Sequence, residues 1–346
     1  MKLKAISTVI ASILMLMIVI ALGGTTYLYV SGTLIGKIST TFEIVDSIND
    51  TVIIRNSGTE PLTSITATLN GNTANTAVVP NIPGLVGYWS LNEGSGTTTD
   101  DNSDNNNIGT LSPSCPDCPS RIVGKHGNAL LFDGTNDYVS VTSTASLRPT
   151  TALTVTAWVR AITSGRWTII AVHELNVETA TWALLVGNFG GTNGRPSFLT
   201  NNGTFTNTNS ATISMATTNI SANTISWYFL AGVYNGTHNV IYVNGVEEAV
   251  AAHAVANDGI GGYDTSDIVA IGGDTTGGFA DLRGEVDEVV VYNRALSESE
   301  IKQLYSGLVS PGQVATIKPL ATLTKGTHTL RLCTSSMCNT AILTIT

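Results

Sequence analysis

The chain has 346 residues and a formal net charge of −9, with 12% charged and 42% hydrophobic residues. About a quarter of the residues of an ordinary soluble protein are charged, so this chain is poor in charge. No basic patch follows the first five residues, which argues against nucleic acid as a partner, and the length predicts two compact units beside an N-terminal segment.

The N-terminal segment is the first element in chain order. Lys2 and Lys4 precede a stretch from Ala5 to Gly36 that has no charged side chain. Its apolar residues do not form one stripe, so we expect a long apolar α-helix over residues 6–37 that is covered on all sides. About 20 helical residues span the roughly 30 Å hydrocarbon core of a bilayer. The expected partners of this helix are lipid first and other copies of the chain later.

Two other interpretations of this segment stay open. A secretory signal peptide has a shorter apolar core followed by a small-residue cleavage site, whereas residues 21–25 offer only a weak site. A simple transmembrane anchor is the second alternative. The lysines before the helix favour an orientation that leaves the rest of the chain outside the cell.

A strand pattern follows Lys37 and returns near the C-terminus. Short segments of alternating residues lie at 42–45, 51–55, 62–69, 313–318, 327–333 and 340–346. The first three predict an immunoglobulin-like start, but a sheet of three or four strands without a second layer is marginal. We therefore expect one β-sandwich formed by residues 38–83 and 310–346, split by an insertion at 84–309.

The cysteines form two close pairs, Cys115/Cys118 and Cys333/Cys338. Outside the cell, such pairs indicate local disulfides. A zinc site shared by both pairs is the alternative, because each pair alone supplies only two thiolates. Four Asn-x-Ser/Thr sequences are candidate sites of N-glycosylation, which would make the chain a glycoprotein, at Asn49, Asn202, Asn219 and Asn235.

The insertion carries a series of short motifs. They lie at residues 87–97, 124–134, 137–139, 153–159, 227–229, 242–245 and 284–297. Alternation within them predicts strands, and Asn244-Gly245 predicts a tight hairpin turn. Ser297 followed by Glu300 is a capping box that predicts a short helix at the end of the insertion.

The order and spacing of these motifs resemble the laminin-G-like branch of the concanavalin A-like jelly rolls, over about residues 84–307. The resemblance implies a jelly-roll domain for adhesion or binding. It also implies that acidic residues of two motifs support a structural calcium ion, here Asp133 and Asp287. The alternative is that both carboxylates accept backbone N–H bonds in turns. No cofactor is required.

The sequence Lys4-Ala5-Ile6-Ser7 before the apolar helix resembles the class III signal of archaeal type IV pilins. The resemblance implies that a prepilin peptidase cuts between Ala5 and Ile6, which makes residues 1–5 a leader. It also implies assembly machinery that moves the retained helix from the membrane into a helical homopolymer. The residues expected to pack between helices are Ile6, Ala11, Leu16, Gly23, Gly24, Gly32 and Gly36.

Catalysis is not expected. Glu285 and Asp287 match the beginning of the Glu-x-Asp-x-x-Glu motif of glycoside hydrolases with related folds, but position 290 is Val. Hydrolysis needs a second carboxyl group across a cleft, and that partner is absent. Strand alternation instead places Asp287 on one face with Val289 and Val291, which makes it an inward-facing residue.

The predicted fold class is therefore mainly β with one long N-terminal hydrophobic α-helix and an immunoglobulin-like pilin β-sandwich interrupted by a concanavalin A-like jelly roll. The predicted function is that of a structural subunit of an extracellular type IV pilus-like filament that displays a laminin-G-like domain to a glycan or protein ligand. The alternative is a monomeric, membrane-anchored cell-surface protein that binds carbohydrate or protein. A glycoside hydrolase comes third.

Overall fold

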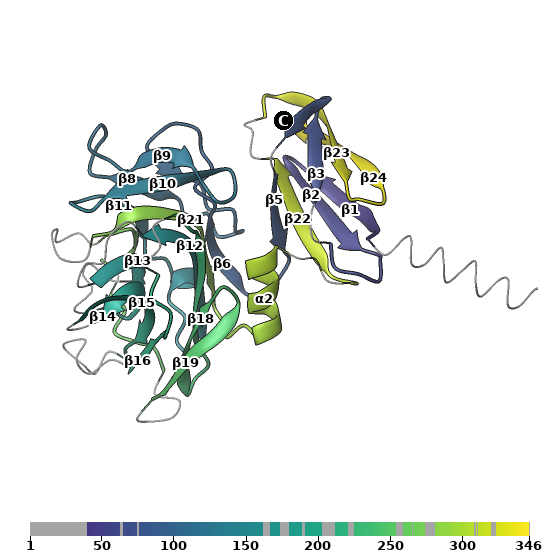
Figure 1. The fold of residues 1–346 in the computed structure, drawn as a ribbon. Coiled ribbons are helices and arrows are strands. Elements are labelled where there is room, and N and C mark those ends of the chain that lie inside the picture. Colours follow the sequence, from purple (N-terminus) through teal and green to yellow (C-terminus); the bar gives the residue numbers. More distant parts are fainter. Residues whose placement is uncertain are drawn as a thin grey trace, which may run out of the picture.

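The computed structural model describes residues 40–345 with some gaps, and these residues form two β-rich bodies (Figure 1). The gaps are residues 63–64, 75, 162–166, 174–179, 189–190, 203–211, 221–224, 254–258, 265, 274–280, 308, 310 and 320–322. The smaller body, which we call the split sandwich, combines both ends of the described chain. The larger body, the inserted domain, is formed by the middle of the chain. Among the described residues the only α-helix is α2 (Glu298–Ser306), which lies between the two bodies (Figure 1).

The split sandwich consists of two four-stranded antiparallel sheets. The first has the order β1 (Phe42–Ile48), β2 (Thr51–Asn56), β22 (Val314–Pro319) and β5 (Thr76–Pro80). The second has the order β24 (Cys338–Ile345), β23 (Gly326–Cys333), β3 (Thr66–Leu69) and β4 (Asn72–Ala74). In each sheet, strands from the end of the chain therefore pair with strands from its beginning.

Alternating side chains from both sheets fill the core of the split sandwich. In β2, Val52 and Ile54 are fully buried, and they lie opposite Ile317 and Ala315 of β22. Residues two apart on a strand share a face, so these four side chains point to the same side. Leu330 of β23, in the other sheet of the split sandwich, belongs to the same buried cluster. Neither end of the chain could bury this apolar surface without the other.

The inserted domain begins with an antiparallel sheet of eight strands. Its order is β19 (Val246–Ala252), β18 (His238–Val243), β17 (Tyr228–Tyr234), β12 (Leu153–Ala161), β21 (Arg283–Tyr292), β10 (Asn128–Asp133) and β9 (Ser120–Val123), with β6 (Leu85–Trp89) paired to the C-terminal half of β21. We call it the first sheet.

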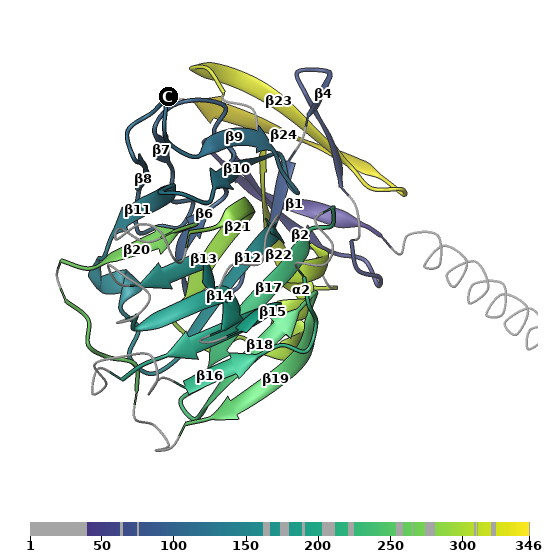
Figure 2. The same cartoon turned by 60° about the vertical axis from the view of Figure 1, so that its left-hand side comes forward.

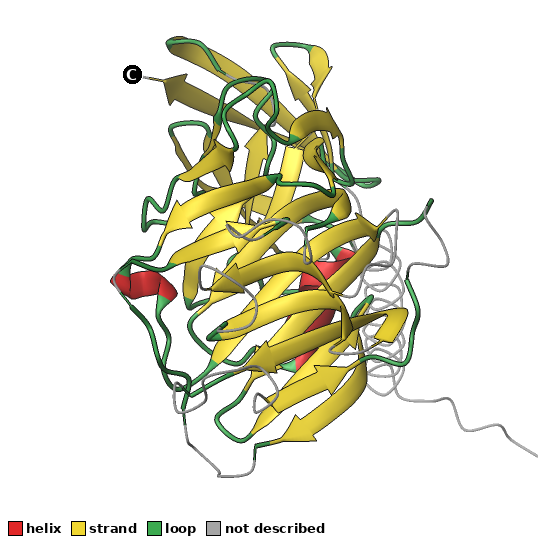
Figure 3. Cartoon of the chain, turned by 90° about the vertical axis from the view of Figure 1, so that its left-hand side faces the viewer, coloured by secondary structure: helices red, strands yellow, loops and turns green. Residues whose placement is uncertain are grey.

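The second sheet also has eight strands. Its order is β16 (Thr212–Met215), β15 (Gly191–Thr200), β14 (Trp182–Asn188), β13 (Trp167–His173), β20 (Ile268–Ile271), β11 (Tyr138–Thr142), β8 (Gly109–Ser112) and β7 (Thr98–Thr99), and the short 3-10 helix η1 (Ala145–Leu147) follows β11. The layers are visible in two further views, and in Figure 3 the second sheet lies in front while α2 lies behind (Figures 2 and 3).

Large apolar side chains fill the space between the first and second sheets. Trp89, Phe132, Trp182 and Phe198 are fully buried there. Glycine is required at one of the contacts, because a Cβ atom on Gly232 would lie 2.1 Å from the ring of Phe198. The inserted domain therefore has its own core, separate from that of the split sandwich.

Helix α2 covers the other side of the first sheet. Ile301 of the helix is fully buried, together with Tyr292 of β21 and Ile82 from the segment that enters the insertion. The capping box predicted from sequence is confirmed: Ser297 Oγ accepts a hydrogen bond from the Glu300 backbone, and Glu300 Oε2 accepts one from the Ser297 backbone. The helix begins where the sequence indicates.

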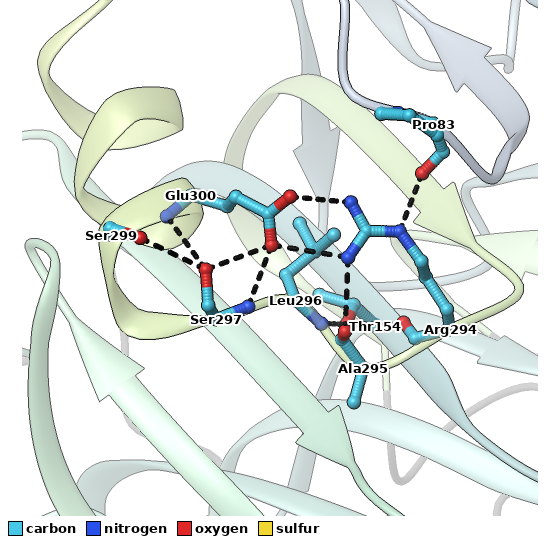
Figure 4. A network of polar contacts seen from close by, with 8 residues as sticks. All are labelled: Pro83, Thr154, Arg294, Ala295, Leu296, Ser297, Ser299 and Glu300. Carbon is cyan, nitrogen blue, oxygen red and sulfur yellow. Dashed lines mark hydrogen bonds and ion pairs between the residues drawn. The ribbon is translucent and has the colours of Figure 1, made fainter.

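Arg294 joins the two ends of the insertion (Figure 4). Its Nε donates to the carbonyl of Pro83 over 2.7 Å, and its Nη2 donates to Glu300 Oε1 over 2.6 Å. The hydrogen bond from Arg294 is the main reason that the pKa of Glu300 falls to about 2. The segment that enters the insertion is thereby tied to the helix that leaves it.

The predicted fold class is wrong in its long N-terminal helix. The α-helix α2 has nine residues, and within the described ranges no helix is sufficiently long and apolar to span a membrane. The expectation rested on hydropathy alone, and the segment that prompted it, residues 6–37, lies outside the described residues. The β-sandwich and the two packed sheets of the insertion agree with the prediction.

Candidate functional site

Polar and aromatic side chains gather on one side of the first sheet. This side, which we call the outer face, is turned toward α2 and away from the core between the sheets. Trp158 of β12 lies opposite Phe229 of β17 and Asp287 of β21. Directly opposed residues of antiparallel strands point to the same side, and Trp158 and Phe229 belong to the cluster under α2. Asp287 therefore lies on the outer face.

A β-bulge places Asp287 there. The register between β12 and β21 shifts between Trp158, which pairs with Asp287, and Thr156, which pairs with Val290. At the bulge, Glu288 has a φ of 54°, a left-handed conformation that is rare for a residue with a side chain. The extra residue turns Asp287 outward, whereas Val289 lies in the core. The expectation that these two residues share a face is therefore wrong.

Asp287 holds a neighbouring loop. Its side chain is fully buried, and Oδ2 accepts a hydrogen bond from the backbone N–H of His126 over 2.8 Å. Only glycine fits at position 124, because a Cβ atom there would lie 2.6 Å from Asp287 Oδ2. Burial, and then the charge of Glu288, raise the pKa of Asp287 well above its usual value.

Glu288 is the second titratable group of the bulge. Its Oε2 accepts a hydrogen bond of 2.5 Å from the Tyr88 hydroxyl, and burial raises its pKa to about 7. Asp287 Oδ1 and Glu288 Oε1 are buried and form no hydrogen bond within the described part of the chain. Two adjacent buried carboxyl groups do not both ionise readily, so the pair retains a proton near neutral pH.

The end of the outer face that lies beyond Asp287 is more open. Arg160 of β12 lies opposite Glu285 of β21, and its Nη2 is 2.6 Å from Oε1 and 2.5 Å from Oε2 of that carboxylate. The guanidinium carbon lies 5.3 Å from the ring centroid of Trp227. The Arg160 side chain is 30% exposed and that of Glu285 is 9% exposed. Trp227 and Arg160 are thus partly exposed, whereas Glu285 is buried.

Comparison with known families assigns the middle of the chain. Residues 133–302 match the model described as the concanavalin A-like lectin/glucanases superfamily. This stretch is a concanavalin A-like jelly-roll domain. The laminin-G-like part of the expectation is therefore confirmed, and none of the comparisons supports a type IV pilin, a filament subunit or an archaeal origin.

Solved structures similar to this chain include three with binding or hydrolytic descriptions. Domain 4 of AbnA, an extracellular arabinanase from Geobacillus stearothermophilus in complex with arabinotriose, is 17% identical over 64% of this chain and 98% of that chain, with a TM-score of 0.49. The binding domain of paraclostridial mosquitocidal protein 1 is 16% identical over 64% and 52%, with a TM-score of 0.48. Trypanosoma rangeli sialidase is 21% identical over 66% and 33%, with a TM-score of 0.45. No curated protein sequence matches the chain.

The two residues proposed to hold calcium do not share a site in the jelly-roll domain. Asp133 lies opposite Arg283 of β21. Because Arg283 precedes Asp287 by four residues, Asp133 and Asp287 are separated by roughly 13 Å along the strand direction. Each carboxylate accepts a backbone N–H bond, Asp133 from Thr135 over 2.8 Å and Asp287 from His126. Within the described ranges no group of three His, Cys, Asp or Glu side chains could hold a metal ion. These residues do not fit one shared cation site.

The carboxyl groups of β21 also lack the arrangement of a hydrolase. Glu285 and Asp287 lie on the same face of one strand, and Glu288 belongs to the same bulge. Glu285 binds Arg160, Asp287 binds the loop, and Glu288 binds Tyr88. A glycosidase uses two carboxyl groups that flank the scissile bond, and this arrangement provides no such pair.

The remaining predicted residues are distributed over the chain. Cys115–Cys118 and Cys333–Cys338 form disulfides, as expected. Among the candidate glycosylation sites, Asn49, Asn219 and Asn235 are exposed and Asn202 is partly buried. The expected cleavage site and helix-packing residues lie outside the described residues, namely Ala5, Ile6, Ala11, Leu16, Gly23, Gly24, Gly32 and Gly36.

One buried cluster was not expected from the sequence. His173 is fully buried, its Nε2 lies 2.7 Å from Ser143 Oγ, and Arg148 Nε donates to the same hydroxyl over 2.9 Å. Asp267 Oδ2 lies 4.0 Å from His173 Nδ1, which is too far for a hydrogen bond. Burial, and then Arg148, lower the pKa of His173 to about 3. The imidazole is therefore neutral, and the buried contact between His173 and Ser143 ties β13 to the segment that follows β11.

Proposed function

We propose that this chain is a carbohydrate-binding protein whose jelly-roll domain recognises a glycan without cleaving it. The observation that carries the proposal is the match of residues 133–302 to a superfamily of lectins and glucanases. The carboxyl groups of β21 favour binding over hydrolysis, because each of them already engages a group of the chain itself.

The two disulfides support a location outside the reducing cytoplasm. We place the protein at the cell surface or in the extracellular medium, where exposed sequons such as Asn219 and Asn235 could carry glycans. In this proposal the split sandwich carries the jelly-roll domain, because both ends of the insertion connect to strands of the split sandwich.

The proposal is tested with the full chain on a panel of soluble polysaccharides. Affinity electrophoresis measures retardation by each polysaccharide, and a reducing-sugar assay measures cleavage of the same samples. We expect retardation by at least one polysaccharide and no release of sugar. Release of sugar would contradict the absence of catalysis, and a chain that no polysaccharide retards would contradict carbohydrate binding itself.

A further inference from the structure

We propose that the disulfide between Cys333 and Cys338 controls a clasp in the split sandwich. The disulfide closes the loop of residues 334–337, which we call the clasp loop. This loop binds residues 40–42, which lead into β1 and which we call the entry stretch. While the disulfide is intact, the clasp loop holds the entry stretch; reduction of the disulfide loosens the entry stretch and leaves both cores folded. The clasp does not depend on the proposed carbohydrate binding.

Thr40 is the first residue that the clasp loop binds. The Thr334 hydroxyl donates to the carbonyl oxygen of Thr40 over 2.9 Å. The hydroxyl oxygens of Thr40 and Ser336 lie 2.5 Å apart. Thr334 and Ser336 belong to the turn between β23 and β24, whereas Thr40 leads into β1 of the other sheet. These contacts therefore join the two sheets of the split sandwich.

Phe42 is the second residue that the hairpin of β23 and β24 binds. β1 lies at the edge of its sheet, where backbone groups on the side away from β2 need other partners. The N–H of Phe42 donates to Met337 Sδ over 3.4 Å, and its carbonyl accepts a hydrogen bond of 2.8 Å from Asn339 Nδ2. The Phe42 side chain is buried in the core of the split sandwich, and Met337 packs against the same core. The hairpin thus shields the backbone of Phe42 from water.

The disulfide ties the hairpin where its other contacts are few. β24 is an edge strand, so Cys338 pairs with a strand on one side only, opposite Cys333 of β23. Inside the clasp loop, the N–H of Thr334 donates to the carbonyl of Met337 over 2.8 Å, and the tip of the loop is exposed. Exposed loop tips with few buried contacts open readily. A covalent bond between the two strand ends reduces the entropy that the loop loses when it binds the entry stretch.

A dithiol reductant opens the clasp by thiol–disulfide exchange. One thiolate of the reductant attacks a sulfur of the disulfide, forms a mixed disulfide and releases the other cysteine as a thiolate. The second thiol of the reductant then displaces the remaining cysteine, and the reductant leaves as its own disulfide. Cys333 and Cys338 together gain two electrons and two protons. Because Cys338 is exposed, the reductant reaches the bond without unfolding of the core.

Release of the clasp loop leaves β1 in its sheet. The carbonyl of Thr41 accepts hydrogen bonds of 3.1 Å from the N–H groups of both Ser57 and Gly58, and β1 stays paired with β2 along its length. Reduction therefore loosens the entry stretch locally and does not detach the strand.

Hydrogen–deuterium exchange of the full chain, measured by mass spectrometry, tests the clasp. We expect the N–H of Phe42 to exchange at least tenfold faster in Cys333→Ser/Cys338→Ser than in the unaltered chain, while peptides from β2 and β22 exchange at unchanged rates. Cys115→Ser/Cys118→Ser is the matched control, because it removes the disulfide of the inserted domain and keeps the clasp. In this control the exchange of Phe42 is expected to stay slow.

A reduction arm avoids any failure of the cysteine variant to fold. Dithiothreitol added to folded Cys115→Ser/Cys118→Ser reduces the clasp disulfide alone, and we expect the exchange of Phe42 to rise at least tenfold and to fall again after reoxidation. Met337→Leu keeps the disulfide and the apolar volume but removes the sulfur acceptor, so the same N–H should exchange faster. Equal exchange of Phe42 in the oxidised and reduced chains would overturn the clasp. An equal rise in β2 and β22 would also overturn it, because the disulfide would then stabilise the whole split sandwich.

Discussion

At the scale of single residues, the bulge in β21 changes what the strand does. Without it, Asp287 would share the core face of Val289; with it, two carboxyl groups lie side by side beneath the loop at His126. Burial of these carboxyl groups disfavours their ionised form, which raises the pKa of both. Two hydrogen bonds offset part of this cost: Asp287 accepts one from the backbone N–H of His126 in the loop, and Glu288 accepts one from the Tyr88 hydroxyl.

Glu288→Gln is expected to remove a pH dependence of stability. The pKa of Glu288 is about 7 in the folded chain, against an ordinary value of 4.5. Between these values the folded state retains a proton that the unfolded state releases, so stability falls as the pH rises from 4.5 to 7. We expect the free energy of unfolding of the variant, relative to the unaltered chain, to rise by about 1–3 kcal/mol over that range.

Urea denaturation at several pH values measures this difference. His173 acts in the opposite direction, since its pKa is lowered from 6.5 to about 3, and stability falls as the pH drops below 6.5. His173 is present in both proteins, so its contribution cancels in the comparison. A difference between variant and unaltered chain that does not change with pH would show that Glu288 does not hold the proton.

At the scale of secondary-structure elements, short-range signals of the sequence located individual elements, whereas strand alternation failed at the bulge of β21. Alternation located β2, and the Ser297–Glu300 pair located the start of α2, because both signals depend on neighbours within a few residues. The bulge depends on the pairing of β12 with β21, two strands far apart in the chain, and the alternation within residues 284–297 does not indicate it.

Arg294→Met is expected to destabilise the closure of the insertion. The variant loses the hydrogen bonds to Pro83 and Glu300, and it leaves the partly buried Glu300 without its cationic partner. We expect a loss of about 1–3 kcal/mol in the free energy of unfolding, the range for charge-assisted bonds. Chemical denaturation at pH 7 measures it.

A cation on helix α2 itself supplies the control. Lys302 pairs with Glu298 one turn away, and both side chains are 56% exposed. Removing it by Lys302→Met should cost less than about 0.5 kcal/mol, as for other exposed pairs on a helix. Equal effects of the two variants would mean that Arg294 contributes no more than a surface ion pair.

At the scale of the whole molecule, the sequence of one two-layered domain is inserted into the sequence of another. The jelly-roll domain has a separate core, whereas the split sandwich needs strands from both ends of the chain. Polar contacts add to the junction: Lys318 of β22 lies 3.2 Å from Asp50 Oδ2 in the split sandwich and 2.8 Å from Asn102 Oδ1 in the inserted domain. Such a partly exposed bridge contributes little energy, which leaves each core to determine its own stability.

Two fragments should therefore behave differently. Residues 81–307 keep the whole jelly-roll core and the buried Ile82, so we expect them to fold alone, with dispersed amide signals in NMR spectra and the glycan affinity of the full chain. Residues 38–307 keep β1, β2, β3 and β5 but lose the strands that pair with them, β22 and β23. The exposed Val52 and Ile54 should then bind a hydrophobic dye, while the jelly-roll signals remain unchanged. Loss of jelly-roll signals in the shorter fragment would show instead that the inserted domain depends on the sandwich that carries it.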